Sequence, residues 1–156
     1  MNNVDFMKAA INITRQGISE GQAPFGAAIA FHGELVTVAH NTVWADTDIT
    51  AHAEVNAIRD ACKKLGKIDL SHCEIFSTTE PCPMCFSAIH WARIHRITYG
   101  TSIQDATRFG FNELEIPDLT MESLSGSRIE LISGYMKEEC IKLFEEWVER
   151  KDKRTY

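Results

Sequence analysis

The sequence has no long apolar run and no excess of positive charge. Its longest apolar stretches, Ala27 to Phe31 and Leu35 to Ala39, are far shorter than the roughly 20 residues that cross a bilayer. The N-terminal residues lack a basic segment followed by an apolar core, so we expect no signal peptide and a cytoplasmic location. The net charge of −6 disfavours a protein that grips a polyanion through a broad basic surface.

The number of cysteines does not favour a disulfide framework. There are five of them, an odd number, in a chain without an export signal, so any clustered pair indicates metal or thiol chemistry instead. With 156 residues, 44% of them hydrophobic and 24% charged, the chain fits one compact domain over residues 1–156.

Apolar patterns with helical and strand periods alternate along the chain. Helices are predicted at 4–19, 51–65, 83–92, 103–109 and 136–151, and strands at 27–31, 35–40, 73–78, 94–99 and 128–133. Residues 112–126 contain Pro117 and are predicted to be mostly loop. Because helices and strands interleave, the pattern predicts a layered α/β domain with a mixed sheet.

Two short motifs carry the residues of a metal site. They are His52-Ala53-Glu54 and Pro81-Cys82-Pro83-Met84-Cys85, and each lies at the start of a predicted helix. Cys82 and Cys85 are three positions apart, so both thiolates can face one point from a first helical turn. One histidine and two thiolates are three protein ligands for zinc, with a fourth position open to water, as in catalytic sites.

The carboxylate beside the histidine completes a hydrolytic site. Zinc can lower the pKa of its water to about 7 and so supply a nucleophile at neutral pH. The positive end of each helix dipole favours thiolates and other anions. Glu54 is not needed as a ligand, so it is free to take a proton from the water and pass it to a substrate.

Two other interpretations of the cysteine pair remain open. A redox pair would be expected in a thioredoxin-like context, which this chain does not have. A structural zinc site needs a fourth ligand, and the other cysteines and histidines have no paired spacing. Cys62, Cys73 and Cys140 fall among apolar neighbours, which favours burial as small apolar side chains.

The motif pair His-x-Glu and Pro-Cys-x-x-Cys is the signature of zinc deaminases that act on nucleobases. The sequence resembles the cytidine and deoxycytidylate deaminase superfamily, and within it the bacterial guanine deaminases and plant guanosine deaminases. The resemblance implies a three-layer α/β/α, cytidine-deaminase-like domain with a five-stranded mixed sheet and bound Zn²⁺. The matching segments are Pro24-Phe25-Gly26-Ala27, Asn41, Thr50 to Val55, Glu80 to Cys85, and Trp91-Ala92-Arg93.

The same resemblance implies a role for each matching residue. His52, Cys82 and Cys85 would be the zinc ligands, and Glu54 the catalytic acid and base. The substrate-binding residues would include Phe25 stacked on the base, Asn41 bonded to the ring or its carbonyl, the backbone N–H of Ala53, and Trp91. Phe25 and Asn41 also fit ordinary loop packing and a turn after a strand.

One departure from the family bears on the substrate. Similar guanine deaminases carry paired aspartates after Gly-Phe, whereas this chain has Gly110-Phe111-Asn112-Glu113. Asn112 replaces one acid, and Glu113 is left as the carboxylate that reads the purine. A site that matches donors and acceptors can reject analogues strongly, so this change affects the prediction of guanine most directly.

The resemblance also implies that the C-terminal residues close the site of a homodimer. The resemblance implies that residues 134–156 form a helix and tail that the two chains exchange, with Tyr156 and Trp147 as lid residues. Trp147 also fits the apolar face of the last helix, and Tyr156 a frayed end.

The reaction predicted on these grounds is guanine deamination to xanthine and ammonia. Guanosine, cytosine and other nucleobases or nucleosides remain alternatives, as does adenosine in tRNA. The basic residues Lys151, Lys153 and Arg154 fit RNA binding or a solvated helix end, and the negative net charge favours the second. A zinc module without catalysis would have no use for Glu54.

The negative net charge disfavours a nucleic-acid partner, and the short apolar stretches disfavour a membrane partner.

Overall fold

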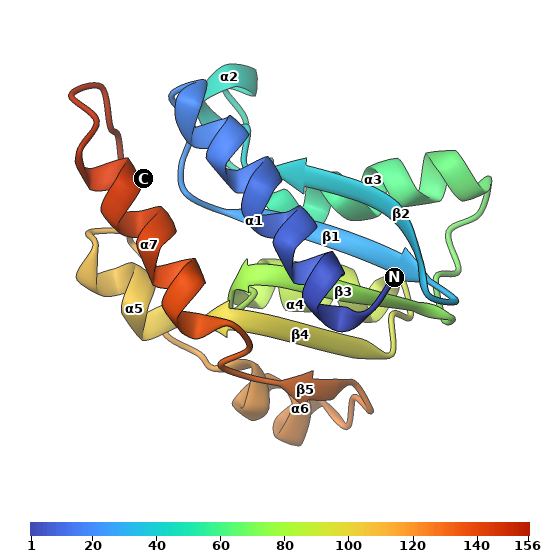
Figure 1. The fold of residues 1–156 in the computed structure, drawn as a ribbon. Coiled ribbons are helices and arrows are strands. Elements are labelled where there is room, and N and C mark those ends of the chain that lie inside the picture. Colours follow the sequence, from blue (N-terminus) through green and yellow to red (C-terminus); the bar gives the residue numbers. More distant parts are fainter.

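A mixed five-stranded sheet forms the centre of the chain, all of whose residues, 1–156, are described by the computed structural model (Figure 1). The strand order is β2-β1-β3-β4-β5. Strand β1 pairs antiparallel with both β2 and β3, whereas β4 pairs parallel with both β3 and β5. The strands are β1 (Gly26–Phe31), β2 (Glu34–His40), β3 (Cys73–Thr79), β4 (Arg96–Thr101) and β5 (Glu130–Ile132).

Helices cover both faces of this sheet, which confirms the predicted three-layer α/β/α fold. In Figure 1, α1 (Asn3–Ser19) and α7 (Lys137–Val148) lie on one face, and α3 (Ala53–Leu65) and α4 (Pro83–Trp91) on the other. A set of 33 buried hydrophobic residues forms one continuous cluster, so both faces share a single core. The shorter helices are α2 (Val43–Asp46), α5 (Ile103–Arg108) and α6 (Asp118–Ser125).

Two of these short helices differ from the sequence-based expectation. The segment 112–126 contains α6, although its proline and polar residues predict mostly loop. Pro117 lies at the N-cap with an extended backbone (φ −61°, ψ 149°), where the lack of an N–H costs nothing, and the helix runs from there to Gly126. Residues 41–50, where neither a helix nor a strand is predicted, likewise contain the single turn of α2.

The strand predicted at 94–99 is displaced toward the C-terminus, and the one predicted at 128–133 is shorter, as β4 and β5. The longest helix, α1, has 17 residues, and no helix combines the length and the apolar character that spanning a membrane requires.

Candidate active site

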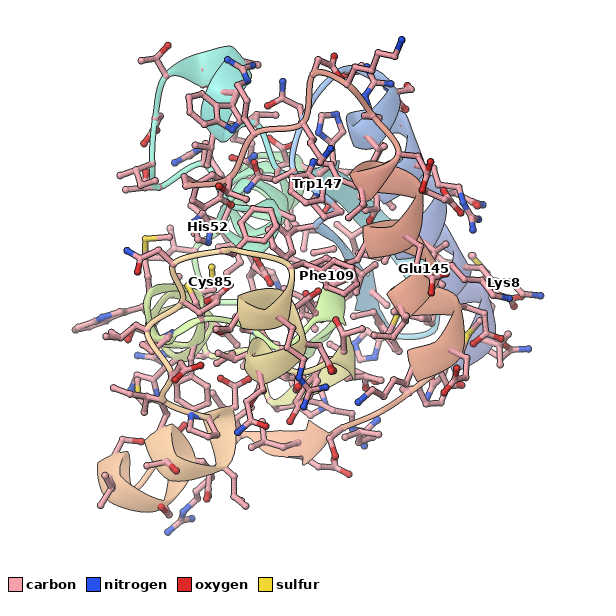
Figure 2. All side chains as sticks on the ribbon, turned by 90° about the vertical axis from the view of Figure 1, so that its left-hand side faces the viewer. Lys8, His52, Cys85, Phe109, Glu145 and Trp147 are labelled. Carbon is pink, nitrogen blue, oxygen red and sulfur yellow. The ribbon has the colours of Figure 1, made fainter.

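The proposed metal ligands lie where the starts of α3 and α4 meet. His52 is the N-cap of α3, Cys82 is the N-cap of α4, and Cys85 lies in the first turn of α4. Nδ1 of His52 is 3.6 Å from Sγ of Cys82 and 3.5 Å from Sγ of Cys85, and Figure 2 shows His52 close to Cys85. Tetrahedral zinc with its usual Zn–N and Zn–S distances would separate these atoms by about 3.6 Å. The three side chains therefore fit zinc as they stand.

The surroundings of the two cysteines favour thiolates. A hydrogen bond from the Cys85 thiol, followed by one with His52, lowers the pKa of Cys82 to about 4 against the opposing effect of burial. Cys85 is buried and shares its proton with Cys82, so its own pKa is raised. A bound divalent cation would favour the thiolate of both residues, because its charge opposes protonation.

Glu54 lies in the first turn of α3 and is only 6% exposed. Burial raises the pKa of its carboxyl, and the neighbouring Cys82 raises it further. The hydroxyl of Ser77, on β3, donates a 2.8 Å hydrogen bond to Oε1 of Glu54 and fixes its orientation. A buried carboxyl beside the metal ligands, with its pKa moved toward neutrality, has the properties of a general acid and base.

Two adjoining cavities open beside these residues and share His52, Cys82, Glu113 and Tyr156 in their walls. The larger has a volume of about 280 Å³, close to the lower end for small-molecule sites. The smaller has about 20 Å³, enough for one water molecule. The other walls of the larger are Ile49, Pro83, Met84, Phe111, Asn112 and Leu114, and those of the smaller are Phe25, Glu54, Thr79 and Glu80.

The segment after α7 returns to the site of its own chain. The side-chain amide of Asn41, which is fully buried, donates a 2.6 Å hydrogen bond to the hydroxyl of Tyr156. The Tyr156 ring lies 5.7 Å from the ring of His52, and the backbone N–H of Asn112 donates to the backbone oxygen of Tyr156 at 3.0 Å. Tyr156 thereby forms part of the wall of both cavities.

The other predicted substrate residues on this side of the sheet also converge. Phe25 packs edge-on against Phe111 at 4.8 Å, and its ring lines the smaller cavity. Ala53 is fully buried as the first residue of α3, so its N–H belongs to the donors left free at a helix start. Glu113 lines both cavities, and burial, followed by the effect of Cys82, raises its pKa to about 7.

Trp91 lies outside this cluster, against expectation. It ends α4, and the helix rise of 1.5 Å per residue places it about 13 Å along the axis from Cys82. The side chain is 83% exposed and lines a separate hollow with Ile68 and Arg93. Trp147 is buried against Phe111, at 5.1 Å between ring centres, so it supports a cavity wall without lining the cavity.

Several wall residues were missed from the sequence. Met84 lies inside the second motif and Glu80 directly before it, and these positions are a signal that could have identified both residues. Thr79 lines the smaller cavity and Ser77 binds Glu54. These two residues are two positions apart on β3, so their side chains lie on the same face of the sheet. Phe111 belongs to the Gly-Phe pair compared with the guanine deaminases, but its place in the wall depends on a loop and on packing against α7.

The geometry of this site has parallels in known proteins. Residues 1–101 match the family model of the cytidine and deoxycytidylate deaminase zinc-binding region. Guanine deaminase of Bacillus subtilis (strain 168) is 42% identical over 114 residues, which is 72% of this chain and 73% of that protein. A tRNA-specific adenosine deaminase of the same organism is 32% identical over 135 residues, covering 86% of this chain and 81% of the relative.

Solved structures agree. A structure of guanine deaminase from Nitrosomonas europaea superposes with a TM-score of 0.85 at 27% identity, covering 94% of this chain and 84% of that one. The family match contains both motifs, and His52, Cys82 and Cys85 stand in the geometry that zinc requires. The chain therefore belongs to the cytidine and deoxycytidylate deaminase family and is a zinc-type hydrolytic deaminase of nucleobases.

Proposed function

We propose that the chain converts guanine and water to xanthine and ammonia. The observation that carries this proposal is the pair of adjoining cavities: His52 and Cys82 line both, Glu54 lines the smaller, and the larger has a volume of about 280 Å³ with Tyr156 in its wall. A single ring system suits a space of this size, whereas a polynucleotide would require residues 149–156 to stay displaced for as long as it is bound. The 42% identity to a guanine deaminase supports the same substrate.

The polar groups of the cavity suit the edge of guanine. The amide of Asn41 points a donor at Tyr156, and a purine carbonyl could accept from the same donor. Guanine has a carbonyl oxygen where adenine has an amino group, so a donor at this point favours guanine. Glu113, which lines both cavities, can accept from a ring N–H or an amino group.

The chemistry then depends on proton transfer by Glu54. His52, Cys82 and Cys85 would hold the zinc, which would supply the Lewis acidity that makes water nucleophilic at neutral pH. Glu54 takes a proton from the water that attacks the carbon bearing the amino group, and passes it to the adjacent ring nitrogen. It transfers the second proton to the amino group, which leaves as ammonia. Ser77 keeps the carboxyl oriented during both transfers.

The test is ammonia release by zinc-loaded protein from guanine, guanosine, adenine, cytosine, cytidine and a tRNA anticodon stem, with Glu54→Ala as the blank. We expect turnover of guanine far above that of the other compounds. Guanosine turning over faster than guanine would shift the assignment to the nucleoside. Turnover of another base with guanine silent would refute guanine as the substrate.

A second candidate, adenosine in tRNA, is favoured by the 32% identity to a tRNA-specific adenosine deaminase. The acidic residues Asp46, Asp48 and Glu115 oppose it, because negative charges near the cavity repel a phosphate backbone. Binding to tRNA that weakens steeply with salt would support this candidate.

We further propose a homodimer in the cytoplasm, where a reducing environment suits five free cysteines. The helices α4 and α6 pack side by side and expose the large apolar side chains of Trp91, Leu119 and Leu124. A second copy of the chain is the partner that would cover them. Trp91→Asp and Leu124→Asp should shift the protein to monomers in sedimentation experiments, and an unchanged sedimentation coefficient would contradict this face.

A further inference from the structure

The carboxylate of Glu80 binds the starts of two different helices. Its Oε2 accepts a 3.0 Å hydrogen bond from the backbone N–H of Ile103, the first residue of α5. Its Oε1 accepts a 2.9 Å bond from the backbone N–H of Asp118, the first residue of α6. These N–H groups have no partner within their helices, and Glu80 is only 7% exposed.

The segment between these two contacts carries much of the substrate cavity. Residues 109–117, which we call the reading loop, connect α5 to α6. Phe111 and Glu113 in this loop line the larger cavity, and the N–H of Asn112 holds the backbone of Tyr156. Glu80 therefore ties together both ends of the segment that contains the loop, and it stands two residues before the zinc ligand Cys82.

We infer that Glu80 is a positioning residue that fixes the reading loop, and through it Tyr156, relative to the zinc ligands. The substrate part of this inference rests on the proposed function. Both carboxylate oxygens accept main-chain donors, so Glu80 acts through the loop and not as a catalytic group. A carboxylate suits the task because each helix start is the positive end of a dipole.

A purely structural cap would lower stability without moving the loop, so the two roles can be separated. Ser102 is a matched control, because its hydroxyl accepts from the N–H of Asp105 and caps the same helix α5. It makes no hydrogen bond to α6. Glu80→Gln keeps the shape of Glu80 but points an NH₂ group at one of two N–H donors, which leaves buried donors unpaired.

The first experiment compares Glu80→Gln with Ser102→Ala by hydrogen–deuterium exchange, without substrate, and by steady-state kinetics. For Glu80→Gln we expect faster exchange in residues 109–117 and 153–156, with zinc content unchanged. We also expect KM to rise about tenfold, with a smaller change in kcat, because a buried hydrogen bond typically contributes this much. Ser102→Ala should leave the exchange of the reading loop and KM unchanged.

The second experiment removes the donor instead of the acceptor. Asp118→Pro lacks the N–H that Glu80 accepts, at a first helical position where proline is well tolerated. Pro117 already has the extended backbone that a following proline requires. Asp118→Ala is the matched control, since it also loses the carboxyl but keeps the N–H. We expect Asp118→Pro to reproduce the exchange and KM of Glu80→Gln, and Asp118→Ala not to.

The inference would be overturned if the reading loop of Glu80→Gln and Asp118→Pro exchanged hydrogen for deuterium at the same rate as that of the wild type. Equal effects of Asp118→Pro and Asp118→Ala would overturn it as well, and this pair decides the matter if Glu80→Gln does not fold. If the loop loosens as expected but wild-type protein deaminates no base, the proposed function fails while the positioning role stands.

Discussion

The hydroxyl of Tyr156 accepts a 2.6 Å hydrogen bond from the side-chain amide of Asn41, a residue 115 positions earlier. Under the proposed function, the carbonyl of the substrate uses this same donor. Tyr156 must then give up the amide when a base enters, so residues 149–156 act as a lid. The guanidinium of Arg154 lies 4.3 Å from the ring centre of Trp44, on α2, and fastens this lid to the body of the protein.

Weakening that contact should make the lid open more often. We expect Arg154→Ala to raise KM about two- to fivefold, because the lid then retains a bound base less firmly, and a cation–π contact at an exposed site contributes about 0.5–1 kcal/mol. Steady-state kinetics on the preferred base measure this. Lys153→Ala removes an equal charge from the same segment without touching Trp44, so equal KM values for the two variants would contradict the lid contact.

The zinc site could be predicted from the sequence because its geometry is local. Cys82 and Cys85 share one helical turn, and both motifs start helices, so the ligand spacing follows from short stretches of chain. The alternating strands and amphipathic helices likewise predicted the layered α/β fold.

The walls of the cavity could not be read in this way. Tyr156 reaches Asn41 only because α7 packs on α1 and β4 and turns residues 149–156 back over the site. Trp91 matches the family pattern, yet the length of α4 places it far from the zinc ligands of its own chain. The helix α6 was missed because proline and polar residues usually indicate loop.

The proton-transfer role of Glu54 predicts a specific separation of metal binding from catalysis. Glu54→Gln should keep its zinc and lower kcat by a factor of about 100 to 10,000, the usual contribution of general acid–base catalysis. Ser77→Ala should lower kcat about tenfold, because one hydrogen bond that orients Glu54 is lost.

The control for Ser77→Ala is Ser87→Ala, whose hydroxyl bonds only to the backbone of α4 at Pro83. It should not change kcat. If Glu54→Gln retained substantial activity at full zinc content, a different group would be moving the protons.

The three-ligand site predicts which cysteines matter for zinc. Cys82→Ser and Cys85→Ser should weaken zinc binding more than about 100-fold, since even changes to residues beyond the ligands typically cost 10–100-fold. Cys62→Ser is the control and should bind zinc normally, because Cys62 lies on α3 outside the ligand set. Competition with a chromophoric chelator measures all three affinities, and loss of zinc in Cys62→Ser would contradict this ligand set.

Asp118 predicts a dependence of stability on pH. Its carboxyl is fully buried without a hydrogen-bond partner, and burial, followed by the charges of Glu80 and Glu54, raises its pKa to about 9. The folded protein therefore keeps a proton that the unfolded chain has released above its ordinary pKa of 3.8. The protonated Asp118 carboxyl therefore makes a contribution to the free energy of unfolding that is fully present below pH 3.8 and is lost as the pH rises toward about 9.

Asp118→Asn removes this titration. The free energy of unfolding of the wild type should fall relative to that of the variant by up to about 1.4 kcal/mol per pH unit between the two pKa values. Urea unfolding at pH 5, 6, 7 and 8 measures the difference. Parallel pH profiles of the two proteins would mean that Asp118 is ionised in the folded state.

Mixed dimers can test whether residues 134–156 are exchanged between chains. One chain carries Glu54→Ala with an intact tail, and the other keeps Glu54 but ends after Val148. Exchange would place the intact tail over the intact site and restore activity to the mixture. We expect no recovery, because Glu146 can pair with Arg15 of α1 at 2.9 Å and Tyr156 can bond to Asn41 without a second chain. A mixture of wild-type chains with the Glu54→Ala chain serves as the reference, because each of its wild-type sites can be completed by an intact tail. Recovery of activity toward the level of this reference would establish the exchange.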